Sequence, residues 1–291
     1  MITLSGIIRE NMTFGSGDTV SLSGNVQIAE GYTVTLGAGS ALLGNSKTIE
    51  VFGNLVISGT SENLLEVEKV DITGSVSMNF VHYSGKVLYG MADRSITNSV
   101  IEFLTYIPEA PEWNAYYPIK MTPLSVFTGN IFSNANIVLS NDVPLRSNTF
   151  IGHSTIAIGD KTDLVGNNFL STASTFLTLG GDGDVTLSGN YWATDNASEI
   201  QGKIKDGNDD LNINGVVDVS NPASSYTSAP LQLGKYSVDL ASMTLVAEAT
   251  QVINLDQYAE FSNSSFVVDS YKAVMGTEPD ALTTSSWTDK L

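Results

Sequence analysis

Side chains with oxygen ligands recur at alternate positions near residue 206 and could bind a metal ion. Asp206, Asn208, Asp210 and Asn212 have a spacing that suits calcium, which prefers carboxylate and carbonyl oxygens. The pattern departs from the usual calcium loop, because Leu211 stands where a glycine is needed and no glutamate closes the loop. Clusters of Asp and Asn are also common turn formers. The sequence therefore predicts either a calcium site or a tight turn at 206–212, and it indicates no other cofactor.

Three aromatic residues gather in a proline-rich segment between residues 107 and 123. They are Trp113, Tyr116 and Tyr117. Because proline cannot donate to a sheet ladder, we predict a loop that projects from the regular structure. Exposed rings are what sugar-binding surfaces and protein interfaces use, so these three are candidate residues for binding a glycan or another partner. The alternative is that the rings fold back and cap the coils beneath them.

Residues that could carry out catalysis are few. Asp160 and Asp163 flank a turn near Arg146 and form the strongest enzymatic candidate, although a turn of this composition needs no catalytic reason. His82 and His153 are the two histidines, and we predict that each is a surface or turn residue. Neither a phosphate-binding loop nor the nucleophile and zinc motifs of hydrolases occur. The sequence assigns no catalytic residue and favours a protein that is not an enzyme.

In the middle of the chain, an asparagine is followed two residues later by a large aromatic residue four times. The pairs are Asn130 with Phe132, Asn148 with Phe150, Asn167 with Phe169, and Asn190 with Trp192. Recurrence at about 20 residues, with short alternating apolar runs between, is typical of stacked coils. Equivalent residues of neighbouring coils lie about 4.8 Å apart, so the asparagines can hydrogen-bond to one another and the rings can stack inside. We predict that these eight residues form a structural ladder.

The coil pattern extends towards the N-terminus with less regularity. Residues 1–75 have β-branched side chains that alternate with period 2 between glycines, which predicts short strands and turns. Residues 79–81 superpose without a gap on residues 148–150, which predicts that Asn79 occupies the ladder position of Asn148.

The composition changes after about residue 233. Glycine becomes rare, and the segments 240–243 and 267–275 have the composition of helices. We therefore predict two domains: a parallel β-helix over 1–235, and a small, partly helical region over 236–291.

The overall charge excludes several classes of partner. The 291 residues include 31 Asp and Glu against 13 Lys and Arg, a formal charge of −18. This field would repel a phosphate backbone and an anionic membrane surface, so we expect no nucleic-acid partner and no membrane insertion. Zero cysteines exclude disulfides and thiolate chemistry. No run approaches the roughly 20 apolar residues of a membrane span, and residues 1–6 do not resemble a signal peptide.

The N-terminal coils and the repeat resemble a known family. Residues 24–39, GNVQIAEGYTVTLGAG, look like the opening coil of right-handed parallel β-helix proteins with the pectin-lyase-like fold, and residues 49–60 continue it. Residues 189–192, GNYW, resemble the closing coils. The resemblance spans roughly residues 20 to 225 and implies the fold. It does not specify the function, because lyases, hydrolases, adhesins and phage tailspikes share this fold.

A second, local resemblance lies near the C-terminus. Residues 271–280, YKAVMGTEPD, followed by Trp287 and Leu291, are similar to a small helical module of bacterial surface and secreted proteins. The module usually has arginine where this chain has Thr277, and glycine where it has Leu282. The resemblance implies a bacterial protein that is secreted or displayed at the cell surface.

Together these features predict an all-β protein, a right-handed parallel β-helix (solenoid) with a small, partly helical C-terminal region. The leading function is non-catalytic: adhesion, surface assembly or glycan recognition by a secreted or cell-surface protein, with a glycan or a surface protein as partner. The main alternative is a polysaccharide lyase or hydrolase of the same fold. A second alternative is a structural fibre, surface-layer or tailspike-like subunit, because exposed terminal coils favour homo-oligomers or end-to-end assembly.

Overall fold

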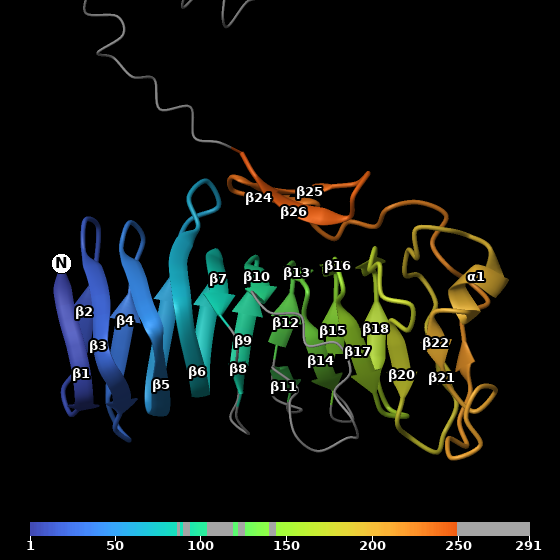
Figure 1. The fold of residues 1–291 in the computed structure, drawn as a ribbon, viewed down its shortest axis with the longest axis horizontal. Coiled ribbons are helices and arrows are strands. Elements are labelled where there is room, and N and C mark those ends of the chain that lie inside the picture. The colour runs from blue at the N-terminus through green and yellow to red at the C-terminus, as the bar shows by residue number, and fades with distance from the viewer. Residues whose placement is uncertain (86–87, 90–93, 104–118, 122–125, 140–143, 249–291) are drawn as a thin grey trace, which may run out of the picture. The chain divides into compact units, whose positions relative to one another are not determined.

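The chain winds into a solenoid of parallel β-strands in which each coil stacks on the one before it (Figure 1). The computed structural model describes residues 1–85, 88–89, 94–103, 119–121, 126–139 and 144–248. Parallel pairing continues from coil to coil, as where Val20 lies beside Leu42 and Leu42 beside Val67. The predicted fold class, an all-β parallel solenoid with very little helix, is confirmed.

Each coil contributes strand residues to three faces, which we call the first, second and third face in chain order. In the early coils, long strands bend from one face to the next. These strands are β1 (Ile2–Ile8), β3 (Thr19–Ile28), β5 (Ala41–Ser58) and β6 (Leu65–Asn79). The short strands β2 (Met12–Phe14) and β4 (Thr33–Leu36) lie on the third face alone. Glycine permits the close stacking of these coils: Gly74 has a φ of 95°, and a Cβ there would overlap the carbonyl oxygen of Val51.

In the later coils each face has its own short strand. The first face continues through β7 (Val81–Gly85), β10 (Val100–Phe103), β13 (Ile131–Ser133), β16 (Thr149–Ile151) and β19 (Asn168–Phe169). The second face continues through β8 (Leu88–Tyr89), β11 (Ile119–Met121), β14 (Asn136–Leu139), β17 (Thr155–Ile158), β20 (Leu177–Leu179) and β22 (Ile204–Lys205). The third face continues through β9 (Arg94–Thr97), β12 (Val126–Thr128), β15 (Pro144–Arg146) and β18 (Asp163–Val165). The helix α1 (Ala197–Gln201) and the strand pair β21 (Val185–Thr186) and β23 (Val217–Asp218) follow.

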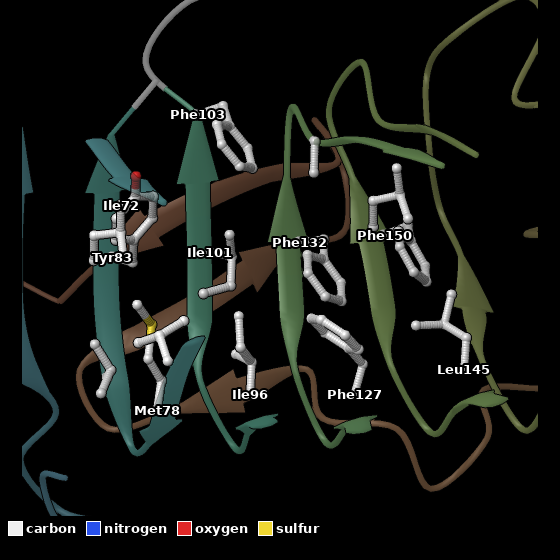
Figure 2. Packing of buried hydrophobic residues seen from close by; sticks show 14 of the residues in the cluster. Ile72, Met78, Tyr83, Ile96, Ile101, Phe103, Phe127, Phe132, Leu145 and Phe150 are labelled. Atoms are coloured by element: carbon white, nitrogen blue, oxygen red, sulfur yellow. The ribbon is translucent and has the colours of Figure 1, made fainter. Parts of the chain in front are cut away.

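The core fills the inside of the coils with the apolar side chains that alternate along each strand. Val20 and Leu22 of β3 point inward and are buried, whereas Ser21 between them is partly exposed. Figure 2 shows the same arrangement in the later coils, where Ile101 and Phe132 line the interior. Burial of these side chains is the main source of stability for stacked coils.

A segment beyond the last coil returns along the outer side of the first face. We call residues 223–247 the strap; it includes β24 (Gln232–Leu233), β25 (Tyr236–Asp239) and β26 (Thr244–Ala247). The three strands pair antiparallel and appear in orange in Figure 1. The strap covers apolar side chains that point away from the solenoid interior. They are Leu64, Val100, Ile131, Ile151 and Leu170.

One predicted helix is wrong, because its residues form a turn within the strap. Residues 240–243 form the turn between β25 and β26, because Asp239 accepts hydrogen bonds from the backbone N–H of Ala241 and the hydroxyl of Ser242. The other predicted helix, at 267–275, lies outside the described residues. Residues 1–248 form one compact unit, and the predicted division at 235 stays a prediction because 249–291 is not described. No helix within the described ranges is long and apolar enough to cross a membrane.

The predicted superposition of Asn79 on Asn148 is wrong by two residues. Parallel pairing through the intervening coils places Val81 at the level of Asn148. Asn79 instead ends β6 on the third face, and Phe80, with a φ of 54°, makes the turn between the two strands. The gap-free match treats residues 79–81 as part of one strand. In the structure, Asn79 ends a strand on the third face and Val81 begins a strand on the first face.

Candidate functional site

The third face carries a hollow over three consecutive coils, at β12, β15 and β18. The middle residue of each strand, Phe127, Leu145 or Leu164, points into the core and is buried. The flanking residues point outward, because side chains alternate along a strand. The hollow has a volume of about 340 Å³, and its outward lining residues are Val126, Thr128, Pro144, Arg146 and Asp163.

An ion pair crosses the hollow from one coil to the next. Arg146 donates from Nε to Oδ2 of Asp163 at 3.1 Å, and its Nη2 contacts the same oxygen. Both side chains remain accessible to solvent, 59% of Arg146 and 39% of Asp163 being exposed. Within the described residues, Nη1 of Arg146 and Oδ1 of Asp163 have no protein partner. Of the two predicted acids near Arg146, the structure brings Asp163 to it and places Asp160 in the turn after β17.

Oxygen atoms of the 206–212 segment serve the turn in which they lie. Asp206 is buried and accepts from the backbone N–H groups of Asn208 at 2.9 Å and Val217 at 2.8 Å. Asp210 pairs with Lys205 at 2.8 Å and accepts from the backbone and side chain of Asn212. The hydrogen bond from Lys205 is the main reason why the pKa of Asp210 is lowered to about 2. Among the described residues, no group of three or more acids and histidines converges as a metal site, and calcium binding stays a prediction.

The asparagines of the repeat form a continuous hydrogen-bonded ladder inside the solenoid. Asn130, Asn148, Asn167 and Asn190 are each fully buried. The side-chain Oδ1 of Asn148 accepts from the backbone N–H of Asn130 at 3.0 Å, and the contact repeats from Asn148 to Asn167 and from Asn167 to Asn190. Each side-chain amide also donates to a backbone carbonyl, as from Asn148 to Phe127. These residues hold the turns together and contribute no surface for a ligand.

The aromatic members of the repeat stack beside that ladder. The rings of Phe132 and Phe150 lie 5.0 Å apart and nearly parallel, and Phe169 and Trp192 continue the row. All four are buried. A different set of aromatic residues was predicted to bind a glycan or another partner. These residues, Trp113, Tyr116 and Tyr117, lie outside the described residues. Their role stays a prediction.

A second cluster, which was not predicted from the sequence, lies between the first face and the strap. His82 of β7 is 7% exposed, so its predicted placement at a surface or turn is wrong. Its Nδ1 lies 2.6 Å from Oε2 of Glu66, and its Nε2 lies 3.3 Å from Oε2 of Glu102. The hydroxyl of Tyr236, from the strap, lies 2.7 Å from the same Nδ1. Lys235 pairs with Oε1 of Glu66 at 2.9 Å.

The protonation of this cluster follows from its geometry. Burial raises the pKa of Glu66, but hydrogen bonds from His82, Lys235 and Tyr236 and the charge of His82 outweigh it and lower the pKa to about 2. Burial lowers the pKa of His82, but the two carboxylates outweigh it and raise the pKa above its usual value. Burial, followed by the charge of Glu66, raises the pKa of Tyr236. Two facts would have been needed to find this cluster from the sequence. One is the register between β6 and β7, and the other is the contact of His82 with Tyr236, which lies 154 positions later.

Comparisons with family models, with curated proteins and with solved structures found no match to this sequence.

Proposed function

We propose that this chain is a non-catalytic β-solenoid that recognises a glycan through the hollow on its third face. The observation that carries the proposal is the lining of the hollow, which combines an accessible ion pair with small apolar side chains across three coils. We further propose a secreted or cell-surface location and membership of the right-handed, pectin-lyase-like β-helix family, both of which rest on the sequence resemblance.

The lining has the chemistry that a sugar ring requires. A pyranose presents hydroxyl groups at its edge and C–H groups on its faces. Nη1 of Arg146 can donate to a hydroxyl, and Oδ1 of Asp163 can accept from one on the neighbouring carbon. Val126, which is 47% exposed, and Pro144 offer an apolar surface for the C–H groups.

The third face also offers room for more than one sugar unit. Ser95 and Thr97 of β9 stand on the outward side of the coil before β12, in register with Val126 and Thr128. Because neighbouring strands lie about 4.8 Å apart, small polar side chains on consecutive coils form a row along which an extended oligosaccharide can lie. The proposed ligand is therefore an oligosaccharide that lies along the row of coils.

The alternative function, a polysaccharide lyase or hydrolase, has a further chemical requirement. Hydrolysis of a glycosidic bond generally uses two carboxyl groups about 5–9.5 Å apart. Asp163 is the carboxylate of the hollow within the described residues, and its Oδ2 is already bound to Arg146. This favours binding over hydrolysis as the function of the hollow.

The proposal is tested by screening the protein against an array of oligosaccharides and measuring the affinity of the strongest ligand by calorimetry. Thr128→Tyr fills the hollow with a ring, and Arg146→Ala removes the donor. We expect each to weaken binding at least tenfold, about 1.4 kcal/mol. Thr35→Tyr is the matched control, because Thr35 lies on the same face and four coils away from the hollow. Equal affinity of Thr128→Tyr and Thr35→Tyr would contradict the assignment of the hollow.

A further inference from the structure

We propose that His82 is a pH-sensitive latch that fastens the strap to the first face of the solenoid. The proposal starts from the position of the imidazole, which lies between carboxylates of the two neighbouring coils and beneath a residue of the strap. The ring of Tyr236 covers the ring of His82 with centroids 4.1 Å apart. One side chain thus connects three segments that are distant in sequence.

The contacts can all be satisfied when both imidazole nitrogens carry hydrogen. Nδ1–H then donates to Oε2 of Glu66, and Nε2–H donates to Oε2 of Glu102. The Tyr236 hydroxyl donates to Glu66, whose two oxygens lie 2.9 and 3.0 Å away. Lys235 completes the set by donating to Oε1 of Glu66. Every strong donor of the cluster meets an acceptor.

When His82 loses one proton, these hydrogen bonds can no longer all be made. A neutral imidazole has one nitrogen without hydrogen, and its lone pair then faces a carboxylate oxygen at 2.6 or 3.3 Å. If Nδ1 is the bare nitrogen, it competes with Glu66 for the Tyr236 hydroxyl. Either tautomer therefore leaves a carboxylate poorly paired in a largely buried site, which costs free energy.

The charges around His82 also make the closed arrangement less stable once His82 has lost its proton. The acids that face the cluster are Glu66 and Glu68 from β6 and Glu102 from β10, and the strap contributes Lys235 and the neutral Tyr236. With His82 protonated, three negative charges face two positive ones. Deprotonation leaves three against one. The attraction between Lys235 and these acids grows only a little, because the lysine side chain is 46% exposed. The partly buried carboxylates lose their closest cation, and their hydration then favours separation of the strap from the face.

Beside β6 and β7, the polar contacts of the strap within the described residues are those with Glu66 and His82, so the latch governs that end of the strap. At later coils, Thr149 donates to the carbonyl of Pro230 at 2.6 Å, and the backbone N–H of Gly152 donates to the carbonyl of Met243 at 2.8 Å. Further hydrogen bonds hold the first part of the strap, between Asn168 and both Thr227 and Ala229, from Thr227 to Gly166 and from Ala223 to Asn190. Val100, which pairs with His82, is fully buried under the strap. Opening at the His82 end would bring this apolar side chain into contact with solvent.

Thiol labelling provides a direct test, because these 291 residues contain no cysteine. In Val100→Cys, the labelling rate by a maleimide, divided by that of a free thiol peptide at the same pH, reports opening of the strap. Ile131→Cys, at a second buried position under the strap, replaces it if the first variant does not fold. Protonation of His82 is followed by NMR, where the two histidines give two sets of ring signals and His153→Gln assigns them.

We expect the corrected labelling rate to rise at least tenfold as pH increases through the titration of His82. In the His82→Gln background the rate should not change with pH, and in Glu102→Gln the rise should move to lower pH. Ile101→Cys, inside the coil, should stay unlabelled throughout and so exclude global unfolding. A corrected rate that is constant with pH, or that rises equally in His82→Gln, would overturn the proposal.

Discussion

At the scale of single residues, the polar groups inside this solenoid are as specific as the apolar ones. The amide of Asn148 donates to two carbonyls and its oxygen accepts from Asn130, all without contact with solvent. No other side chain of similar size offers both a donor pair and an acceptor, which explains why asparagine recurs at this position. Each asparagine therefore fixes the distance between its coil and the next.

Removal of one ladder asparagine should be costly. Asn148→Ala leaves buried carbonyls and N–H groups without partners, and we expect a loss of roughly 2–4 kcal/mol in the free energy of unfolding. The control, Asn54→Ala, removes an exposed asparagine and should change stability by less than about 0.5 kcal/mol. Urea denaturation of both variants checks this; equal losses would show that the ladder contributes nothing special.

The buried histidine predicts how stability depends on pH. Since the pKa of His82 is raised in the folded state, its contribution is present below the unfolded value of about 6.5 and is lost as pH rises through the folded value. Since the pKa of Glu66 is lowered to about 2, its contribution is present above about 4.3 and is lost as pH falls towards 2. The stability of the wild type relative to His82→Gln should thus be greatest between about pH 4.5 and 6.5. Urea midpoints near pH 3, 5.5 and 9 measure it, and an unchanged difference between pH 5.5 and 9 would be inconsistent with this assignment.

What the sequence could predict at this scale depended on local spacing. The Asn and aromatic repeat was visible because each pair spans only three residues, where a turn meets the first face, and the pairs recur at similar steps. His82 was misassigned because its environment is created by pairing of β6, β7 and β10 and by a strap residue far along the chain. Arg146 and Asp163 were recognised as neighbours because only one turn of the solenoid separates them.

At the scale of elements, the close approach of neighbouring coils limits which side chains a strand can carry. Gly74 has both a positive φ and no space for a Cβ beside Val51. Gly17 also has a positive φ, 86°, but has open space around it. Comparison of Gly74 with Gly17 therefore separates the need for a positive φ from the need for space beside a neighbouring coil.

We expect Gly74→Ala to destabilise the solenoid by more than about 2 kcal/mol, because backbone strain and a steric overlap add. Gly17→Ala should cost only about 1 kcal/mol, from backbone strain alone. Thermal denaturation of the two variants tests the comparison. Equal losses would mean that β5 and β6 can separate without penalty.

The turn at 206–212 gives a prediction about calcium. Because Asp206 and Asp210 already accept hydrogen bonds from protein donors, we expect the same thermal midpoint in calcium and in chelator at matched ionic strength. A rise with calcium and not with magnesium, lost in Asp210→Asn, would contradict this and would support the calcium site indicated by the alternating oxygens.

Element prediction from the sequence was accurate where alternation was clean and failed at the strap. Residues 240–243, LASM, have good helix formers, but pairing of β25 with β26 and the side chain of Asp239 determine a turn there. Propensity over four residues is too weak to compete with these contacts.

At the scale of the whole molecule, the solenoid of residues 1–248 presents a repeated surface on which neighbouring coils add functional groups at a fixed spacing. The hollow at β12, β15 and β18 depends on three coils at once, and no single strand reveals it. This is why the sequence predicted the fold far better than the site. Assembly into a homo-oligomer or end to end stays a prediction, which light scattering of the purified protein can test.

We propose that the hollow binds a glycan without cleaving it. Native mass spectrometry after incubation with the strongest ligand from the array measures both properties in one spectrum. We expect an adduct of intact oligosaccharide with the wild type and with Thr35→Tyr, and a much weaker adduct with Thr128→Tyr. Shortened or unsaturated oligosaccharides that form with the wild type, or equal adducts with all three proteins, would contradict it.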